Sequence, residues 1–345
     1  MYNIGKRITV KVGIRQNESI TYFHECVKSG SLVYEEKKCI CGSSDKTDIL
    51  VEYDRYGIYS PLVICKDCSL AYLSTFLNEK SLIKFYKKQY RKMYSESYRT
   101  PEYIYNMQVR TGQRYRDLLI SCSSLPTSGS VIDIGCGPGG VLKAFNNENL
   151  DCFGCDFDDE YMDYGRRLGL ELRNGDLFDV YNKKKFNLVI MSHVLEHVSY
   201  PVEYLYDIHN MMEKNGVILI EVPGLKSLHL GCVERFFQGV HLNTFYGDYM
   251  KKLMECLGFD VLYCDEVLSI VCKKKRASLT INEIQEILRD FQYNYRENYN
   301  YIARTVYLYN YGLNIGIYKR IIRRFIVNTL DACGLKKYIK LLCNI

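Results

Sequence analysis

The sequence predicts an α/β fold built on a mostly parallel sheet, and three observations lead to this prediction. Between residues 130 and about 272, apolar runs alternate with amphipathic segments in the order that gives strands covered by helices. Two of these runs, FNLVIMS (186–192) and GVILIEV (216–222), are almost entirely apolar, as strands buried on both faces are. The first run, VIDIG, leads directly into the glycine-rich turn GCGPGG. We therefore expect a parallel sheet with a ligand-binding turn after its first strand.

The remaining elements follow from the same kinds of pattern. Between the strands, apolar residues recur at helical spacing. The helix after the second strand opens with Asp158 and Asp159 and closes with Arg166 and Arg167, as the helix dipole favours. We expect helices over 79–94, 103–120, 139–147, 158–169 and 248–258, and strands over 131–135, 152–156, 186–192, 216–222, 259–264 and 268–274. The last two strands are close enough in sequence to form a hairpin-like pair.

The two ends of the chain are less regular. Residues 1–38 alternate only weakly and give no firm assignment. Near the other end, Thr280 and Glu283 form a capping box that opens a helix, and a second stripe over 317–330 is apolar on one side and basic on the other. We expect four units: an N-terminal segment (1–75), a helical cap or linker (76–122), the sheet domain (123–273) and a basic helical extension (274–345).

Composition predicts a globular protein of the cytoplasm. The 345 residues are 47% hydrophobic and 25% charged, no apolar run is long enough to span a membrane, and the start has no apolar signal segment. Fifteen cysteines in such a chain indicate reduced thiols rather than a disulfide framework. The net charge is +6, yet the segment from Lys273 onward has 14 basic and 5 acidic residues. Its basic stripe fits a helix docked on protein, and it also fits a peripheral contact with an anionic membrane.

The glycine turn fits two classes of ligand. Gly135, Gly137 and Gly140 match the G-x-G-x-x-G spacing that places a pyrophosphate on backbone N–H groups. Two neighbours disfavour a dinucleotide, because Pro138 has no N–H to donate and the carboxylate of Asp133 would repel a phosphate. S-adenosylmethionine (SAM) has no phosphate, and an acid attracts its ammonium and sulfonium charges. The turn therefore favours SAM.

Acidic residues also follow the next two strands. Asp156 ends the run CFGCD, 21 residues beyond Gly135, where a carboxylate can bind both hydroxyls of a ribose. Sites for nicotinamide dinucleotides and for SAM share this feature, so it indicates a ligand site without deciding between them. In RNGDLFD, Asp176 can accept from an adenine amino group, while the backbone N–H of Leu177 donates to the ring.

Together these residues resemble the class I SAM-dependent methyltransferases. The resemblance rests on DIGCGPG (133–139), on Asp156, on GDL (175–177) and on SHVLEHV (192–198). It implies a Rossmann-like sheet of seven strands whose final strand is antiparallel, with SAM as the ligand. It also implies cofactor contacts from Asp133, Gly135, Gly137, Gly139 and His193, the last beside the methionine part.

Two pairs of cysteines indicate a metal site. Cys39 and Cys41 are separated by 23 residues from Cys65 and Cys68, and the segment between contains the turn DRYG, as a ribbon hairpin would. Four thiolates suit tetrahedral Zn²⁺ and leave no open position, so the metal would be structural. Because the first pair is C-x-C, both of its thiols can bind one ion only if Gly42 lets the chain turn tightly. Incidental thiols are the alternative.

A zinc ribbon followed by an aromatic helix is similar to the arrangement in many bacterial methyltransferases of this class, including sugar and surface-glycan enzymes. The helix here contains Phe85, Tyr86, Tyr90, Arg91 and Tyr94. The resemblance implies that Tyr90 and Tyr94 contribute to the cofactor site. Ribbons also occur in nucleic-acid-binding proteins, but this one lacks a clustered basic and aromatic surface, so no nucleic-acid partner is expected.

Candidates for chemistry on the methyl acceptor follow strands four and five. Methyl transfer to a hydroxyl needs a group that removes the acceptor proton. Glu196 and His197 follow the fourth strand, although the start of a helix and its packing would explain them as well. His241, in FFQGVHLNTFY, is the preferred general base because imidazole titrates in the useful range. A hydrogen-bonded core histidine is the alternative interpretation.

The segment before His241 bears on the type of acceptor. Sugar C-methyltransferases that share the ribbon have a Tyr-x-Glu-His cluster here and a longer C-terminal domain, whereas this chain has Gln238, Gly239 and Val240 before His241. Both differences favour O-methylation of a sugar, a glycan or a related small molecule. The alternatives are C-methylation of a nucleotide-linked keto sugar and, from a different class, a zinc-ribbon adaptor with a SAM-sensing domain. The oligomeric state does not follow from the sequence.

Overall fold

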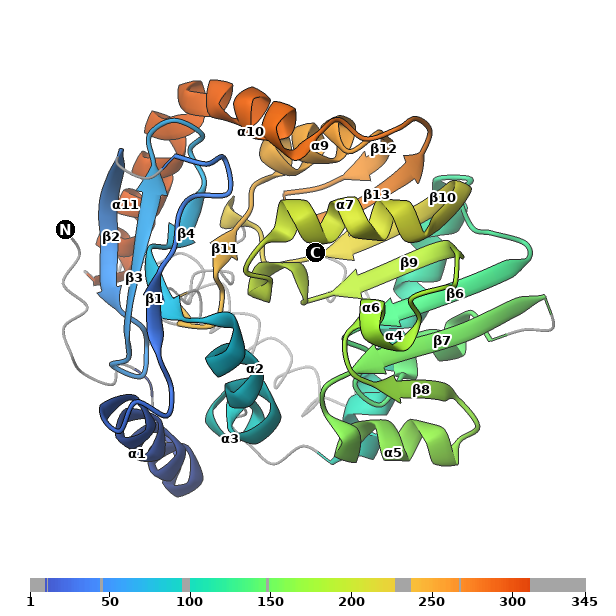
Figure 1. Cartoon of the computed structure of the whole chain (residues 1–345), viewed down its shortest axis with the longest axis horizontal. Helices are drawn as coiled ribbons and strands as arrows, with labels where there is room; N and C mark the ends of the chain where they lie inside the picture. Colours follow the sequence, from blue (N-terminus) through green and yellow to red (C-terminus); the bar gives the residue numbers. More distant parts are fainter. Residues whose placement is uncertain are drawn as a thin grey trace, which may run out of the picture.

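The computed structural model describes residues 10, 12–43, 46–94, 100–146, 149–226, 237–266 and 268–310. Its larger sheet has seven strands in the order β12-β13-β10-β9-β6-β7-β8 (Figure 1). These strands are β6 (Gly129–Ile134), β7 (Leu150–Asp156), β8 (Glu171–Asn174), β9 (Phe186–Ser192), β10 (Met212–Glu221), β12 (Phe259–Cys264) and β13 (Ser269–Lys274). β13 runs antiparallel to both of its neighbours, and the other pairs are parallel. The predicted α/β sheet with an antiparallel final strand is confirmed.

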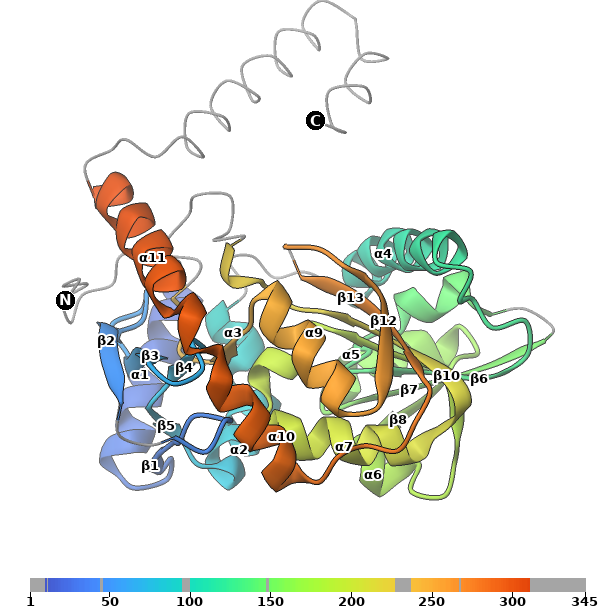
Figure 2. The same cartoon turned by 90° about the horizontal axis from the view of Figure 1, so that it is seen from above.

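Helices cover both faces of this sheet (Figure 2). α4 (Pro101–Ser121), the 3₁₀ helix η1 (Gly140–Ala144) and α5 (Asp159–Arg167) share a core with one face. α7 (Pro201–Met211) and α9 (Gly247–Cys256) share a core with the other face. Successive residues of one strand belong to opposite cores, since Val131 faces α4 whereas Ile132 belongs to the core with α7. Burial on both faces explains why these strands are apolar runs.

The helix predicted over 139–147 is wrong in length and type. Only Gly140–Ala144 is helical, as a tight 3₁₀ turn. α4 passes so close that a Cβ atom on Gly140 would lie 2.2 Å from the carbonyl oxygen of Tyr105. This close contact holds the segment against α4. The segment therefore forms one short turn with i→i+3 hydrogen bonds.

The second sheet is built mostly from the N-terminal region and lies beside the first (Figure 1). It contains β2 (Thr47–Tyr53), β3 (Tyr59–Cys65), β4 (Ala71–Leu73) and β11 (Asn243–Thr244), in the order β11-β4-β3-β2. The predicted turn DRYG joins β2 to β3, and a small pair, β1 (Tyr34–Glu36) with β5 (Thr75–Leu77), lies next to it. We call β2–β4 and β11 the ribbon sheet. Its strand β11 comes from the chain after β10, so the two sheets are joined through the segment 237–246.

Further helices surround the ribbon sheet. α1 (Ile14–Lys28) was not predicted, and its Phe23 packs edge-to-face on Phe85 of α2 (Glu79–Lys88). The helix expected over 79–94 is divided at Gln89 into α2 and α3 (Tyr90–Tyr94). The capping box of Thr280 is confirmed and starts α10 (Ile281–Arg289). A 3₁₀ segment, Asp290–Asn294, follows α10 and precedes α11 (Tyr295–Asn310).

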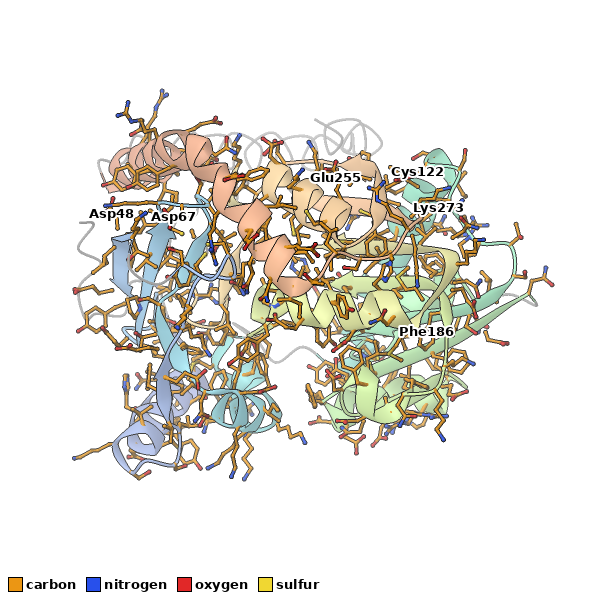
Figure 3. All side chains as sticks on the ribbon, turned by 45° about the horizontal axis from the view of Figure 1, so that its top comes forward. Asp48, Asp67, Cys122, Phe186, Glu255 and Lys273 are labelled. Atoms are coloured by element: carbon orange, nitrogen blue, oxygen red, sulfur yellow. The ribbon has the colours of Figure 1, made fainter. Side chains whose placement is uncertain are left out.

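The helices α10 and α11 return to the ribbon sheet. Arg289 donates from Nε to the carbonyl oxygen of Cys41 at 2.8 Å, and Ser69 donates to the carbonyl oxygen of Phe291 at 2.7 Å. Tyr295 also donates to Asp48, which Figure 3 shows beside α11. The basic stripe predicted over 317–330 lies outside the described residues. No helix within the described ranges is both long and apolar enough to cross a lipid bilayer.

Candidate functional site

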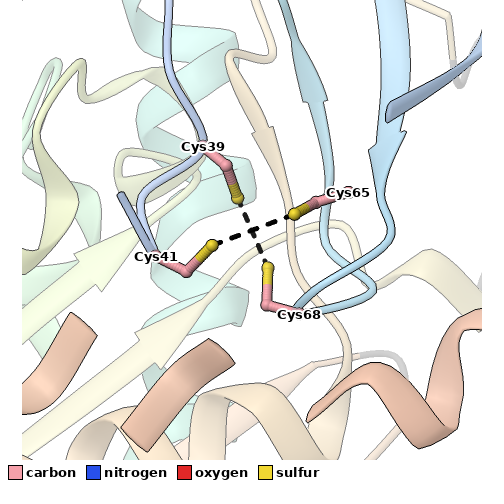
Figure 4. A group of neighbouring side chains, drawn as sticks. All are labelled: Cys39, Cys41, Cys65 and Cys68. Carbon is pink, nitrogen blue, oxygen red and sulfur yellow. Dashed lines mark hydrogen bonds between the residues drawn. The ribbon is translucent and has the colours of Figure 1, made fainter. Parts of the chain in front are cut away.

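The four cysteines of the two predicted pairs converge on one point at the edge of the ribbon sheet (Figure 4). The Sγ atoms of Cys39 and Cys68 are 3.3 Å apart, and those of Cys41 and Cys65 are 3.8 Å apart. Tetrahedral Zn²⁺ with sulfur at about 2.3 Å requires S···S separations of about 3.8 Å. All four side chains are buried, and their sulfur atoms lie within 4.8 Å of one another. The donor set therefore fits a closed, four-thiolate zinc site.

The C-x-C spacing of the first pair is accommodated by the turn that the sequence requires. Gly42 has φ = +81°, a left-handed conformation that other residues rarely adopt. Its amide donates to the carbonyl oxygen of Cys39 at 2.8 Å, which closes a tight turn around Cys41. A Cβ atom at position 42 would also lie 2.8 Å from a guanidinium nitrogen of Arg289. Glycine at this position is thus needed for the turn and for the approach of α10.

The glycine turn after β6 is held by side chains from two other elements. Gln108 of α4 accepts from the amide of Gly140 at 3.0 Å and donates to the carbonyl oxygen of Cys136 at 3.0 Å. Asp156, at the end of β7, accepts from the amide of Gly137 at 2.7 Å. These contacts fix the turn at the point where the strand order changes direction, between β7 and β9, which is where open α/β sheets bind ligands.

Asp133, the acid just before this turn, is almost fully buried. One of its carboxyl oxygens has no hydrogen-bond partner within the described residues. Burial, with a further contribution from the charge of Asp156, holds the pKa of the Asp133 carboxyl well above its usual range. A cationic group such as an ammonium would offset this cost and favour the carboxylate form, whereas a phosphate would add to it.

The predicted adenine contacts are at the end of β8. Asp176 caps the short helix α6 (Leu177–Val180), since its Oδ1 accepts from the amide of Phe178 at 3.1 Å. Its Oδ2 accepts from the hydroxyl of Tyr204 at 3.2 Å. Leu177 is fully buried. Burial raises the pKa of the Asp176 carboxyl, although these hydrogen bonds oppose the shift.

Val194 joins the glycine turn to the residues that follow β9. A Cβ atom on Gly135 would lie 2.5 Å from a methyl carbon of Val194, so the two segments are in close contact. The preceding residue, His193, has φ = +56°, an uncommon conformation for a residue with a side chain. Its backbone amide donates to the carbonyl oxygen of Glu221 at 2.8 Å. The predicted methionine-side residue thus lies at the junction between the glycine turn and a second cluster.

That second cluster contains the three residues predicted for acceptor chemistry. One nitrogen or oxygen atom from each of Glu196, His197 and His241 lies within 4.8 Å of the other two. Two histidines and one carboxylate at this spacing can bind a cation or exchange a proton. Nε2 of His197 is 3.6 Å from Glu196, and Nδ1 of His193 is 3.4 Å from the same carboxylate. The rings of His197 and His241 meet edge-to-face, with centroids 5.0 Å apart. We call Glu196, His197 and His241 the histidine cluster.

Glu196 is the charged centre of the histidine cluster. The residue is 1% exposed, and neither carboxylate oxygen has a well-formed hydrogen bond within the described residues. Burial alone would raise the pKa of Glu196, but the charges of His197, His193 and His241 outweigh it and lower the pKa to about 2. The cluster therefore holds a buried carboxylate that histidine protons or an added cation can neutralise.

The aromatic helix predicted to serve the cofactor lies beside this cluster. The rings of Tyr86 and Tyr90 are centred 5.6 Å and 6.0 Å from that of His197. Tyr94 stacks on Tyr90 and donates its hydroxyl to Asp54 at 3.1 Å. Among the described contacts, Tyr90 and Tyr94 are thus placed with the histidine cluster and the ribbon sheet.

Sequence reasoning missed several residues of this region. Gln108 belongs to no motif, and the motifs that contain Tyr86 and Asp54 gave no sign of their contacts with His197 and Gly239, which are far away in the sequence. Glu221 ends β10, and its carboxylate accepts hydrogen bonds from both terminal guanidinium nitrogens of Arg114, at 2.7 and 2.8 Å. An acid at the end of the fifth strand was a detectable signal, since the carboxyl ends of parallel strands meet at one edge of the sheet.

Comparison with protein-family models matches residues 103–263 to a model described as a methyltransferase domain. This segment contains the glycine turn, the acids after β7 and β8, and all three residues of the histidine cluster. A search of curated proteins finds no match.

Solved structures with a similar fold include three methyltransferases. The plantazolicin methyltransferase BpumL, in complex with SAH, is 16% identical over 56% of this chain and 94% of its own, with a TM-score of 0.41. A SAM-dependent methyltransferase from Clostridium acetobutylicum is 11% identical over 51% and 98%, with a TM-score of 0.39. The carbon methyltransferase CurJ is 13% identical over 48% and 54%, also with a TM-score of 0.39.

Proposed function

We propose that this chain is a SAM-dependent methyltransferase and that it methylates a hydroxyl group of a sugar, a glycan or a related small molecule, in line with the match of residues 103–263 to a methyltransferase domain. One observation carries the proposal. A buried carboxylate and two histidines, Glu196, His197 and His241, are joined through Val194 to the turn that would hold SAM. Residues suited to remove a proton therefore lie next to the cofactor site, where an acceptor must approach.

This arrangement suggests a separate role for each residue. SAM supplies an electrophilic methyl carbon on a positively charged sulfur. Asp133, the glycine turn, Asp156, Asp176 and His193 would hold it. His241 takes the proton of the acceptor hydroxyl as the new carbon–oxygen bond forms and the carbon–sulfur bond breaks, and it then returns the proton to solvent. Glu196 stabilises the imidazolium that forms, because its carboxylate is buried and already close to the histidines.

We also propose that the four cysteines bind one structural Zn²⁺. Their burial and sulfur spacing support this proposal, and four thiolates would exclude water from the metal. The ion would fix the end of β3 against the loop 39–42, and so the edge of the ribbon sheet.

C-methylation of a nucleotide-linked keto sugar is the second candidate, and one observation favours it. Position 240 is a valine, so the chain lacks the carboxylate that a Tyr-x-Glu-His cluster would have directly before His241. Glu196 brings a carboxylate to the same histidines from another strand. Abstraction of a carbon-bound proton would exchange that proton with deuterium in D₂O before transfer, whereas O-methylation leaves carbon-bound protons unexchanged.

The test is methyl transfer from isotopically labelled SAM to pools of sugars, nucleotide sugars and glycans, with products identified by mass spectrometry. His241→Gln should lower the transfer rate by roughly 10²-fold to 10⁴-fold, the usual contribution of a general base. Its affinity for SAH should stay within about twofold, and exogenous imidazole should restore part of the rate. His24→Gln, on the exposed face of α1, is the matched control.

Full activity of the His241→Gln protein would exclude the proposed base. A rate that depends on added Mg²⁺ or Mn²⁺ would also contradict it, because the histidine cluster would then act as a cation site. Labelled product in a nucleic-acid or protein fraction alone would overturn the proposed class of acceptor.

A further inference from the structure

The ribbon sheet is physically connected to the histidine cluster, and we propose that Asp54 is the positioning residue of this connection. It fixes the backbone that orients His197 and carries His241, without touching the acceptor itself. The inference rests on the proposed function for its catalytic meaning. Its structural content, an oriented imidazole, can be measured independently.

Asp54 lies in the turn between β2 and β3 and is 2% exposed. Its Oδ1 accepts from the amides of Tyr56 and Ile58 at 2.8 and 2.9 Å, which closes the hairpin turn. Its Oδ2 accepts from the amide of Gly239 at 3.2 Å and from the hydroxyl of Tyr94 at 3.1 Å. One buried carboxylate thus joins three segments: the hairpin, α3 and the segment that precedes His241. All four partners donate, so they suit a carboxylate, which only accepts; burial raises the pKa of the Asp54 carboxyl, and these hydrogen bonds oppose that shift.

The bond to Gly239 bears directly on the next two residues. The carbonyl oxygen of Val240 is 2.8 Å from Nδ1 of His197. Since a carbonyl only accepts, Nδ1 must carry a hydrogen, and Nε2 is the nitrogen that faces Glu196. The amide of His241 donates to the carbonyl oxygen of Gln238 at 3.1 Å, so Gly239 and Val240 form a tight turn between two fixed points.

The surroundings leave little freedom for any other arrangement. A Cβ atom on Gly239 would lie 3.1 Å from Ser60, 3.2 Å from Asp54 and 3.3 Å from Phe76. On either side of the turn, the amide of Arg55 donates to Phe237 and the amide of Leu73 donates to Leu242. The ribbon sheet therefore holds the segment at its ends, and Asp54 holds its centre, where His197 is oriented.

Asp54→Asn tests this role. The amide group has one accepting oxygen, so its NH₂ group must face either the hairpin amides or the pair formed by Gly239 and Tyr94. In either orientation two of the four hydrogen bonds lose their acceptor, and the new NH₂ group faces the N–H or O–H groups that donated to it. We expect the Val240 carbonyl to shift and His197 to lose its fixed Nδ1–H form.

The primary measurement is long-range ¹H–¹⁵N NMR of the imidazole nitrogens, with the His197 signals assigned from a His197→Gln protein. Wild-type His197 should show the Nδ1–H tautomer, and Asp54→Asn should show a mixture of tautomers. SAH affinity by calorimetry should stay within about twofold, because Asp133 and Asp156 are untouched. Methyl transfer should fall by about 10² fold, the cost typical of a displacement near 1 Å.

Two controls separate positioning from general damage. Asp48→Asn removes a carboxylate from the adjoining strand, β2, and should leave the His197 signals unchanged. Asp54→Ser keeps a hydroxyl that can cap the hairpin amides but cannot reach Gly239. It should reproduce the tautomer mixture and serves as the test if Asp54→Asn does not fold. An unchanged His197 tautomer in the folded variant would overturn the proposal, as would equal losses of SAH binding and transfer with that tautomer intact.

These outcomes are distinct from a failure of the proposed function. The imidazole and SAH measurements need no acceptor, so they stand even if the methylated product is not a hydroxyl ether.

Discussion

The carboxylate of Asp156 accepts a hydrogen bond from the backbone amide of Gly137 at 2.7 Å, so the end of β7 braces the turn that follows β6. Its second oxygen accepts from the amide of Asp158 at 2.8 Å, at the start of α5. The acid expected to bind a ribose therefore also shapes the glycine turn. Because protein contacts hold the turn, less of the cost of ordering it falls on ligand binding.

Asp156→Ala should reduce SAM affinity more than the loss of one ligand contact would. The substitution removes an acceptor for the ribose and frees the amide of Gly137, which disorders the turn. We expect at least about a 100-fold rise in Kd, equivalent to roughly 2.7 kcal/mol, measured by titration calorimetry. Asp159→Asn, an exposed acid in the first turn of α5, should bind SAM as the wild type does. Wild-type affinity in Asp156→Ala would contradict the predicted role.

Gly112→Ala should destabilise the protein through one backbone contact. A Cβ atom at this position of α4 would lie 2.4 Å from the carbonyl oxygen of Val141. The helix must move away from the glycine turn, and such overpacking typically costs about 1–3 kcal/mol. Chemical denaturation should show this loss, with weaker SAM binding as a secondary effect. Gly13→Ala, where a Cβ atom would meet only the tip of Gln16, is the control.

Cys65→Ser should remove the metal. One Zn²⁺ per chain is expected in the wild type by elemental analysis, and three thiolates should retain it poorly. Loss of the ion should lower the unfolding temperature and expose the other cysteines to thiol reagents. Cys122→Ser, which replaces a partly exposed thiol at the end of α4, should keep the ion. A zinc-free wild-type protein of unchanged stability would contradict the proposed site.

Glu196→Gln should change how stability depends on pH. Partial desolvation opposes the protonation of His193, whose side chain is 57% exposed, but contact with Glu196 outweighs it and raises the pKa of His193, while the pKa of Glu196 is lowered to about 2. The lowered pKa of Glu196 stabilises the fold above about pH 4.5, and this stabilisation is lost as the pH falls toward 2. The raised pKa of His193 stabilises it below about pH 6.5, and this is lost as the pH rises through the folded value.

The difference in unfolding free energy between wild type and Glu196→Gln should therefore peak at about pH 5–6 and decrease on both sides. Denaturation curves between about pH 3 and 9 would measure it. His197, His241 and Tyr86 face the same carboxylate, so the histidines should be followed individually by NMR. Glu213→Gln, an exposed acid of β10, should show no such peak. A difference that does not vary with pH would contradict the prediction.

The sheet domain could be predicted well because its signals are local. Leu188 and Ile190 pack on one face of the sheet while Val189 and Met191 pack on the other, so the β9 run is recognisable as a continuous apolar segment. Likewise, α5 starts and ends where its acidic and basic residues predict. The 3₁₀ turn after Gly139 was mispredicted because its form depends on α4, which approaches from outside the segment.

The grouping of the histidine cluster was only partly predictable. Glu196 and His197 are neighbours in sequence. His241 lies beside them because β11, which follows it, pairs with β4 of the ribbon sheet. A two-residue strand gives almost no periodic signal. Helix α1 was missed for a related reason, since its buried side includes the polar residues Gln16 and Ser19. The amide of Gln16 donates to the carbonyl oxygen of Met93, a contact that no local pattern reveals.

The bonds from Arg289 to Cys41 and from Ser69 to Phe291 join positions 248 and 222 residues apart. During synthesis, the cysteine loops leave the ribosome long before α10 does, so their outer side stays open until α10 has been translated. A Zn²⁺ ion that arrives in that interval would meet accessible thiols, and the later arrival of α10 would then cover the proposed site. Exchange of the proposed ion in the finished protein should accordingly be slow, because it requires the local release of α10. The hydrogen bond from Arg289 to Cys41 would then help to set how long the ion stays bound.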